Sequence, residues 1–316
     1  MSAHASAPQA AERGATAWSR ASSTRGDPYA PRLTASRRKW ALYRAEPGFM
    51  VACARLLDEL GPPVVESLRA HAVALVKPEA WLEWRFPLVQ SFLARAGFEV
   101  IDVFRCELPP VTCREVWRYQ WNVGPIERIE LSEVLLGLGP SYGLVLRDCD
   151  PAPRTAASVR LARLKGPALP ERQGPGHLRY ELGAPNRIVS FVHVPDEPAD
   201  IVRDLSLLLD RNALVQLLAR MLEPNRRALQ LDAEAFRDVA RIEEGGFETP
   251  LAARDGQRRS ERIGRLREAA ARCARGADGC RVPRPLWRAL LDAADEVAAL
   301  PTCGRKRVEP VADQSW

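Results

Sequence analysis

The sequence predicts an α+β sandwich, in which helices pack against a mainly antiparallel sheet, followed by a helical C-terminal extension. Two observations lead to this fold class. Four short, apolar, β-prone runs lie between residues 71 and 194, and stretches with helical spacing of apolar residues separate them. The order is strand, helix, strand, two helices, strand, helix, long loop, strand and helix, which is typical of helices layered on a small sheet. A chain of 316 residues is long enough for one large or two modest domains.

The N-terminal part of the chain divides into a tail and a helical lead-in. Residues 1–37 are rich in Ala, Ser, Pro and Arg, and we expect them to be a disordered tail. This Arg-rich, acid-poor stretch would also suit an organelle transit peptide, but the same composition runs through the whole chain. We expect a helical lead-in over 38–69, in which residues 49–60 form an amphipathic helix that ends at Gly61.

The strands and helices of the central region follow in a fixed order. The first strand is expected in HAVALVKPEA (71–80), a continuous apolar run before Lys-Pro-Glu. The helix after it ends at Gly97. The apolar residues that share one face of this helix are Trp81, Trp84, Leu88, Phe92 and Leu93. The later elements are a strand at 98–108, a helix that begins at Pro110 or Thr112 and runs to Trp117, a helix at 129–139, a strand at 142–148, a helix at 155–166, a loop at 166–183, a strand at 187–194 and a helix at 198–209.

The region from 222 to 300 reads as helical and resembles no family. We expect helices at 233–246, 258–275 and 283–300, and a second disordered tail at 301–316. The apolar stripe of the middle helix, with arginines on the opposite face, suits a helix that packs on a core. The members of that stripe are Ile263, Leu266 and Ala270.

Composition narrows the partners and the compartment. The net charge of +6 favours anionic partners, but it does not choose among nucleotides, nucleic acid and acidic lipid. Seven scattered cysteines without a CxxC pair suit a reducing cytoplasm, and no histidine lies near Cys273 or Cys280 to complete a zinc site. We expect no membrane span, because no apolar stretch approaches the roughly 18–20 residues that a span needs.

A histidine stands at the end of an apolar run, in RIVSFVHVPDEP (187–198). Two interpretations compete for His193. It is either a packed core histidine or a reactive group mounted on a rigid element. Imidazole is neutral near pH 7 and can act as a nucleophile, and a strand end would hold it in a fixed position.

Five stretches of the chain, in order, resemble those of nucleoside diphosphate kinases. They are VKPEA, ARAGFEVIDVFRCEL, GLGPSYGLVL, LKGPALPERQGPGHLRYELG and VHVPD, within a domain at 70–212. The resemblance implies a ferredoxin-like, nucleoside diphosphate kinase-type sandwich, a phosphohistidine intermediate and a homo-oligomer. It also implies Mg²⁺ bound with ATP or another nucleoside triphosphate, and no metal held by the protein's own residues.

The resemblance assigns roles to particular residues. His193 matches the nucleophile, and Asp204 stands where the family has the glutamate that orients it. Lys77 and Arg179 match phosphate-contacting residues. The residues expected to bind nucleotide are Lys77, Arg163, Arg179 and Ser190, with Ser190 in place of a sugar-contacting asparagine and Arg163 beside an expected arginine position. Each role has a plainer alternative. Lys77 would then be a lysine that reaches solvent from a strand end, Arg179 a surface arginine in a loop, and Asp204 a solvated helix residue.

Several family contacts are absent, and their loss bears on activity. Pro195 replaces a serine, Ala168 replaces a phosphate-contacting threonine, and Trp117 falls near the position of a tyrosine. Each lost charge-assisted hydrogen bond costs on the order of 1.5–3 kcal/mol, so we expect slow turnover with ordinary nucleotides.

Three functions from different classes follow. The chain is a nucleoside diphosphate kinase-like phosphotransferase, or a catalytically weakened nucleotide-binding regulatory or scaffold protein of the same fold. In the third, basic C-terminal helices contact nucleic acid through Arg258, Arg259 and Arg262. We favour the first narrowly over the second, and both over the third, because the aromatic residues typical of single-strand binding are missing.

Overall fold

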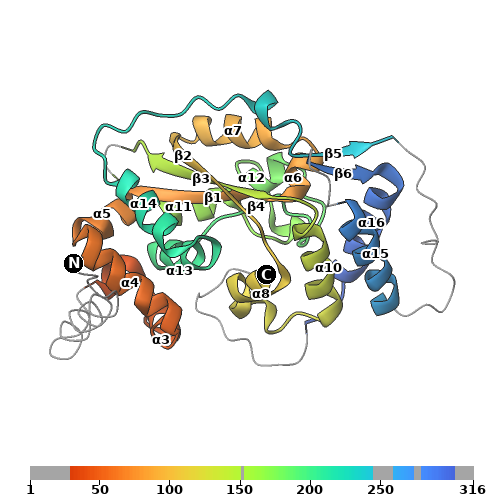
Figure 1. Cartoon of the computed structure of the whole chain (residues 1–316), viewed down its shortest axis with the longest axis horizontal. Coiled ribbons are helices and arrows are strands. Elements are labelled where there is room, and N and C mark those ends of the chain that lie inside the picture. The colour runs from red at the N-terminus through yellow and green to blue at the C-terminus, as the bar shows by residue number, and fades with distance from the viewer. Residues whose placement is uncertain (1–28, 151–152, 245–258, 274–278, 303–316) are drawn as a thin grey trace, which may run out of the picture.

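A four-stranded antiparallel sheet lies at the centre of the protein, as the sequence predicts (Figure 1). The computed structural model describes residues 29–150, 153–244, 259–273 and 279–302. The sheet order is β2-β3-β1-β4, and every neighbouring pair is antiparallel. Its strands are β1 (His71–Val76), β2 (Phe98–Cys106), β3 (Ser141–Asp148) and β4 (Val192–His193). The α+β class with helices around an antiparallel sheet is therefore confirmed.

The two faces of the sheet carry different cores because side chains alternate along a strand. In β1, Ala72, Ala74 and Val76 belong to one hydrophobic cluster. Val73 belongs to a second cluster on the opposite face, and Leu75 belongs to a third, smaller one. A buried strand of this kind reads as a continuous apolar run, which is how HAVALV reads in the sequence.

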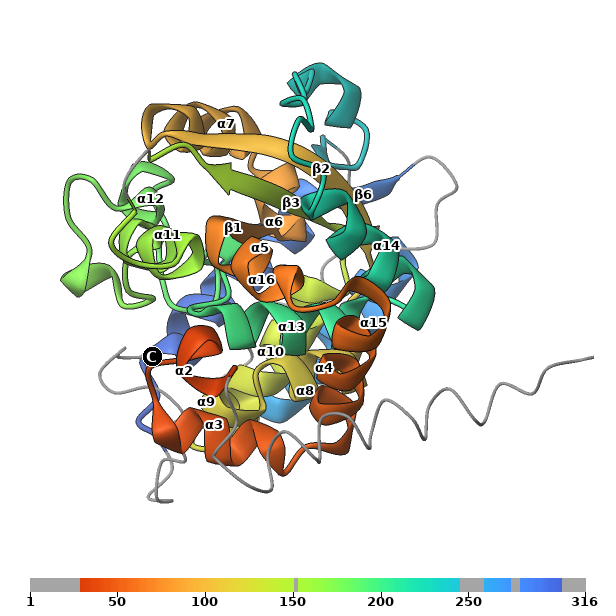
Figure 2. The same cartoon turned by 90° about the vertical axis from the view of Figure 1, so that its left-hand side faces the viewer.

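Helices cover both faces, and α7 and α13 lie on opposite sides of the sheet (Figure 2). The helices on the Val73 face are α2 (Ala30–Leu33), α3 (Arg37–Arg44), α4 (Pro47–Leu60), α5 (Pro63–Ala70), α13 (Pro198–Leu208) and α14 (Arg211–Met221). The helices that contribute to the cluster of Ala72, Ala74 and Val76 are α6 (Pro78–Leu82), α7 (Phe86–Arg95), α10 (Ile126–Leu136), α11 (Ala157–Lys165) and α12 (Leu178–Glu181). The third cluster includes α8 (Pro110–Val116), which α9 (Arg118–Trp121) follows, and a 3₁₀ turn spans Pro170–Arg172.

The lead-in helices begin earlier than the sequence indicates. α2 begins at Ala30, inside the stretch expected to be a tail, and its Leu33 is buried. Residues 1–28 and 303–316, which make up most of the two expected tails, lie outside the described residues. Helix α14, which the sequence analysis missed, packs against α4 and α5.

The last central strand is much shorter than expected. Only Val192 and His193 of the predicted strand 187–194 pair with β1. The preceding residues turn instead, because the side chain of Asn186 accepts the backbone N–H groups of Ile188 and Val189. Phe191 takes a positive φ of 61°, which ends the turn directly before the strand. The apolar run therefore resembles a strand in the sequence, although the side chain of Asn186 accepts two of its backbone N–H groups in place of a neighbouring strand.

The expected helix at 233–246 is wrong. A 3₁₀ turn spans Ala233–Phe236, and β5 (Ala240–Glu243) follows, paired in parallel with β6 (Cys280–Pro283). The partner strand lies some forty residues further along the chain, so a local pattern of apolar residues cannot reveal this pairing. The other two helices form as expected, as α15 (Arg259–Cys273) and α16 (Arg284–Ala298). The part of the prediction that covers 245–258 lies outside the described residues.

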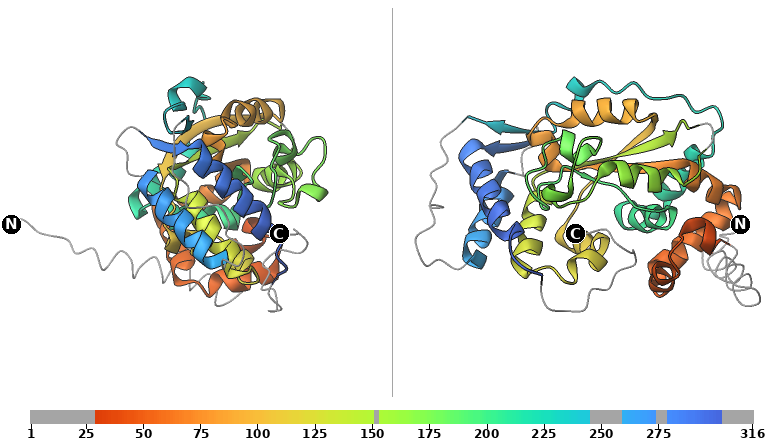
Figure 3. Two further views of the ribbon diagram at one scale, coloured as in Figure 1. Left: turned by 90° about the vertical axis from the view of Figure 1, so that its right-hand side faces the viewer. Right: turned by 180° about the vertical axis from the view of Figure 1, so that it is seen from behind.

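The C-terminal helices extend the core of the sheet. α15 and α16 lie side by side against α10 (Figure 3). Leu266 and Leu290 are fully buried in the same cluster as Ala74 of β1. The link between the two regions runs along the outer edge of β2, where Leu229 N–H donates to Val100 O over 2.7 Å. This contact covers a strand edge that would otherwise be open to pairing.

Among the described residues, no helix is both long and apolar enough to cross a membrane.

Replacing Leu290 with Ala should lower the free energy of unfolding by about 2–5 kcal/mol, because a fully buried leucine is lost from the shared core. Urea denaturation measures this change. Leu88→Ala is the matched control, since Leu88 is 44% exposed and its loss should cost no more than about 0.5 kcal/mol. If the two variants lose equal stability, the C-terminal helices do not complete the core of the sheet.

Candidate functional site

His193 is fixed at the end of the sheet by its pairing with β1. His193 lies opposite Leu75, and Val192 lies opposite Val76. Because directly paired residues point to the same face, the imidazole shares the face of Leu75. Trp117 packs edge-on against the ring, with the ring centroids 5.2 Å apart. The histidine is only 7% exposed.

Asp204 holds one nitrogen of the imidazole. Its Oδ2 lies 2.8 Å from His193 Nε2. The aspartate projects from α13, whose first turn is fixed by a capping box between Glu197 and Asp200. The other ring nitrogen, Nδ1, is buried and has no hydrogen-bond partner. In the neutral ring, the carboxylate favours the tautomer in which Nε2 donates, so Nδ1 keeps its lone pair.

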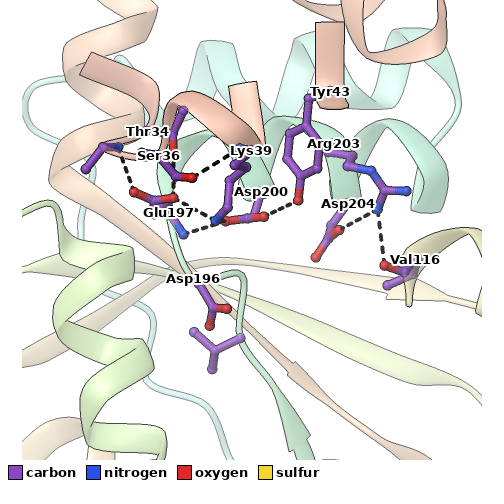
Figure 4. Close-up of polar contacts among 12 residues, drawn as sticks. Thr34, Ser36, Lys39, Tyr43, Val116, Asp196, Glu197, Asp200, Arg203 and Asp204 are labelled. Atoms are coloured by element: carbon purple, nitrogen blue, oxygen red, sulfur yellow. Dashed lines mark hydrogen bonds and ion pairs between the residues drawn. The ribbon is translucent and has the colours of Figure 1, made fainter. Parts of the chain in front are cut away.

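A buried ionic network lies behind this pair and connects α13 to the N-terminal helices (Figure 4). Arg203 donates to Glu46 with Nε 2.9 Å from Oε2, and its Nη1 lies 3.7 Å from Asp204 Oδ1. Arg203 Nη1 also donates to Val116 O over 3.1 Å. The guanidinium therefore joins α4, α8 and the carboxylate that holds the histidine.

Asp200, one turn earlier on α13, accepts hydrogen bonds from two side chains of α3. Lys39 Nζ lies 2.5 Å from its Oδ2, and the hydroxyl of Tyr43 donates to its Oδ1. Burial alone would lower the pKa of Lys39, but Asp200 and Glu197 outweigh it and hold that pKa above its ordinary value. The ammonium is thus charged and fully paired, and α3 locks the position of α13.

Lys77 points into the same region as His193, but its charge is already paired. Its Nζ lies 2.5 Å from Oε1 of Glu79, a carboxylate that is 1% exposed. It also donates to Ser190 Oγ over 3.1 Å and to Ile188 O over 3.3 Å. Burial lowers the pKa of Lys77, and Glu79 opposes that effect. The structure thus brings Lys77 and Ser190 together through a direct bond.

Arg179, on α12, is buried and mainly bonds to backbone. Nη1 donates to Gly166 O over 3.0 Å, and Nη2 donates to Val192 O over 3.2 Å. Its Nε is buried without a partner. Burial lowers the pKa of Arg179 to about 10. The guanidinium therefore ties the loop after α11 to β4 and keeps one unsatisfied N–H.

These residues line one small cavity of about 60 Å³. The predicted site residues in its wall are Lys77, Arg179, Ser190 and His193. Trp117, Trp121 and Arg187 are among the residues that narrow it. This volume is far below the roughly 300–1,000 Å³ of small-molecule pockets. A whole nucleotide does not fit beside His193 in this conformation.

Arg163 does not belong to this cavity. It lies on α11 and lines a separate hollow beside the turn that leads into α13. Two further buried groups are not apparent from the sequence. Glu79 neutralises Lys77, and Lys165 bonds to Asp196 with Nζ 3.1 Å from Oδ1. The only sequence signal for Glu79 was its place two residues after Lys77, in VKPEA.

Metal-ligating side chains do not cluster among the described residues, and two of the arginines expected to contact nucleic acid are paired. In the described part of the chain, no group of three His, Cys, Asp or Glu side chains could hold a metal ion. Arg259 and Arg262 both pair with Glu296 of α16, at 2.6 and 2.9 Å. Arg258 lies outside the described residues. The arginine face of α15 is thus partly neutralised within the protein.

Comparison with known proteins adds a likeness of fold. No protein-family model matches the chain, and no curated protein matches it either. Three solved nucleoside diphosphate kinases are similar to it. The enzyme from Aquifex aeolicus is 18% identical over 45% of this chain and 96% of its own, with a TM-score of 0.36.

The enzyme from Halobacterium salinarum, solved in complex with CDP, is 16% identical over 53% of this chain and 97% of its own, with a TM-score of 0.37. The enzyme from Pyrobaculum aerophilum is 14% identical over 45% of this chain and 97% of its own, with a TM-score of 0.32. Values this low carry no argument about activity, which must come from the site itself.

The two buried histidines should hold opposite tautomers. His193 should carry its proton on Nε2 because Asp204 accepts there. His71 should carry its proton on Nδ1, which lies 2.8 Å from Ser67 O. Nitrogen-15 NMR of the histidine-labelled protein, which has four histidines, distinguishes the two forms at mildly alkaline pH. A proton on Nδ1 of His193 would contradict the assignment of a free lone pair.

Replacing Arg203 with Leu should cost about 3–5 kcal/mol of unfolding free energy, because the change leaves the buried Asp204 and the half-buried Glu46 without this partner. Arg118→Leu is the control, since its ion pair with Glu115 is exposed and should be worth about 0–1 kcal/mol. Thermal or urea unfolding compares the two variants. Similar losses would show that the network behind Asp204 contributes little.

Proposed function

We propose that the protein is a nucleoside diphosphate kinase-like phosphotransferase in which His193 carries the phosphoryl group. One observation supports this most directly. Asp204 engages Nε2 of His193, while Nδ1 is left without a partner at a cavity that Lys77 and Arg179 also line. A nucleophilic histidine needs this arrangement of one oriented nitrogen and one free lone pair.

In the proposed step, the Nδ1 lone pair attacks the terminal phosphorus of a nucleoside triphosphate. A nitrogen–phosphorus bond forms, the bond to the bridging oxygen breaks, and its electron pair leaves with the nucleoside diphosphate. The Nε2 proton stays on the ring, where Asp204 stabilises the positive charge that develops. An acceptor nucleoside diphosphate then takes the phosphoryl group from Nδ1 through its terminal oxygen, which restores the neutral imidazole.

The cations of the cavity have clear roles in this proposal. Arg179 can offer its unpaired Nε–H to a phosphate oxygen, and Lys77 can turn from Glu79 toward the same charge. Ser190 holds the lysine from one side and would lie near the nucleotide. Since the described residues form no metal site of their own, Mg²⁺ would arrive with the triphosphate and reduce its charge.

The size of the cavity makes turnover slow. A nucleotide enters only if the wall formed by Trp117 and Trp121 moves, because the space beside His193 is about 60 Å³. These two indoles stack with centroids 5.3 Å apart. They lie on and beside α9, a helix of four residues. Opening such a wall is a conformational step that can limit the rate in place of chemistry.

The finer features implied by the resemblance belong to the same proposal. The strand order β2-β3-β1-β4, with helices between the strands, supports a ferredoxin-like arrangement. Six described cysteines are free, which fits a cytoplasmic protein. A homo-oligomer would have to use a surface other than the covered edge of β2.

A second candidate is a catalytically weakened protein of this fold that binds nucleotide for regulation or serves as a scaffold. The close pair between Lys77 and Glu79 favours it, because an internal carboxylate already occupies the cation that would otherwise meet phosphate.

Incubation with ATP labelled at its terminal phosphate should give a slowly formed, acid-labile and alkali-stable label on the protein. His193→Ala should abolish the label, because the acceptor nitrogen is lost. His177→Ala is the control, since that ring accepts from Gly174 N outside the cavity and should leave labelling unchanged. Nucleotide binding without label would replace the first candidate with the second.

A further inference from the structure

A second and larger hollow lies on the other side of the turn between β4 and α13. Its volume is about 430 Å³, within the range of small-molecule pockets. Its walls come from α2 and the residues after it, the end of α5, the stretch that leads into α11, and the start of α13. These elements lie near one another in Figure 2. The hollow and the cavity at His193 share no lining residue.

Four arginines line this hollow, and two of them have no partner among the described residues. Arg32 pairs with Glu66, and Arg69 donates to Arg32 O over 3.1 Å. Arg154 and Arg163, in contrast, are exposed and make no hydrogen bond or ion pair within the described part of the chain. Arg154 comes just before α11, and Arg163 lies in its last turn.

The carboxylates of the hollow do not cancel this charge, because a buried lysine pairs with each of them. Glu197 accepts from Thr34 Oγ1 over 2.7 Å and from Ala35 N over 2.8 Å, and it also pairs with Lys39 Nζ at 2.7 Å (Figure 4). Asp196 receives Lys165 Nζ at 3.1 Å. Burial would raise the pKa of Asp196, but Lys165 and Lys39 outweigh it and hold that pKa below its ordinary value. The charge left for a ligand is therefore positive.

Part of the wall is aliphatic, and Thr34 and Thr155 add two hydroxyl groups to it. Leu33, Val159 and Ala162 contribute apolar surface, and no aromatic side chain is among the lining residues. An aromatic base would find nothing to stack on, whereas an aliphatic chain would find a matching wall. The planar, unpaired guanidinium groups suit a phosphate, which accepts several charge-assisted hydrogen bonds.

We propose that this hollow binds a small aliphatic phosphate ester, with its phosphate at Arg154 and Arg163 and its carbon chain against Val159. The site is separate from phosphoryl transfer at His193 and does not depend on it. Free phosphate shares the anionic chemistry but would not use the aliphatic wall.

Titration calorimetry with monobutyl phosphate, whose carbon chain is apolar, tests the site in the full chain. The unmodified protein should bind this probe more tightly than inorganic phosphate. The double variant Arg154→Gln/Arg163→Gln should bind it about tenfold or more weakly, because two charge-assisted contacts are lost. The double variant Arg172→Gln/Arg211→Gln is the matched control, since it removes the same charge from exposed positions outside the hollow and should bind normally.

Three outcomes would overturn the proposal. The unmodified protein binds no probe, the control loses as much affinity as the test variant, or inorganic phosphate binds as tightly as the ester. Binding that survives in Arg154→Gln/Arg163→Gln but disappears in His193→Ala would belong to the other cavity and would equally contradict this site. A failure of labelling at His193 would leave the site untouched, so the two proposals can fail independently.

Discussion

The contact between Asp204 and His193 is the interaction on which the rest of the site depends. It joins the last strand of the sheet to the helix that follows, across a buried distance of 2.8 Å. Holding a carboxylate there is costly unless its remaining contacts are satisfied. Arg203 meets this need from the same helix, and Glu46 in turn holds Arg203. The N-terminal helices therefore support the geometry of the site.

The free-energy cost of burying an unpaired charge also explains why the site is closed. Lys77 is almost fully buried, where an unpaired ammonium would be unstable, and Glu79 supplies its counterion. Arg179 satisfies two of its nitrogens with backbone carbonyl groups. A phosphate would have to compete with these internal partners. Cation pairs of this kind stabilise the ligand-free protein, and they reduce the positive charge that an incoming nucleotide could meet.

The sequence predicts most of the elements and only part of the site. Periodicity was sufficient for helices such as α4 and α16 and for the buried strand β1, because each has a clear apolar pattern of its own. It failed at β5, whose partner β6 is distant in sequence, and at 187–191, where the side chain of Asn186 replaces strand pairing. The prediction that one site contains Lys77, Arg179, Ser190 and His193 rested on the resemblance to nucleoside diphosphate kinases. Three features depend on packing in three dimensions. They are the Lys77–Glu79 pair, the wall formed by Trp117 and Trp121, and the position of Arg163 outside the cavity at His193.

The central claim is that Nδ1 of His193, and no other atom, is the phosphoryl acceptor. The measurement that tests it most directly is NMR of the phosphorylated protein with phosphorus-31 and nitrogen-15 detection, which identifies the bonded ring nitrogen. We predict a phosphorus–nitrogen coupling to Nδ1, with Nε2 still protonated toward Asp204. Phosphate found on Nε2, or on a residue other than His193, would contradict this claim.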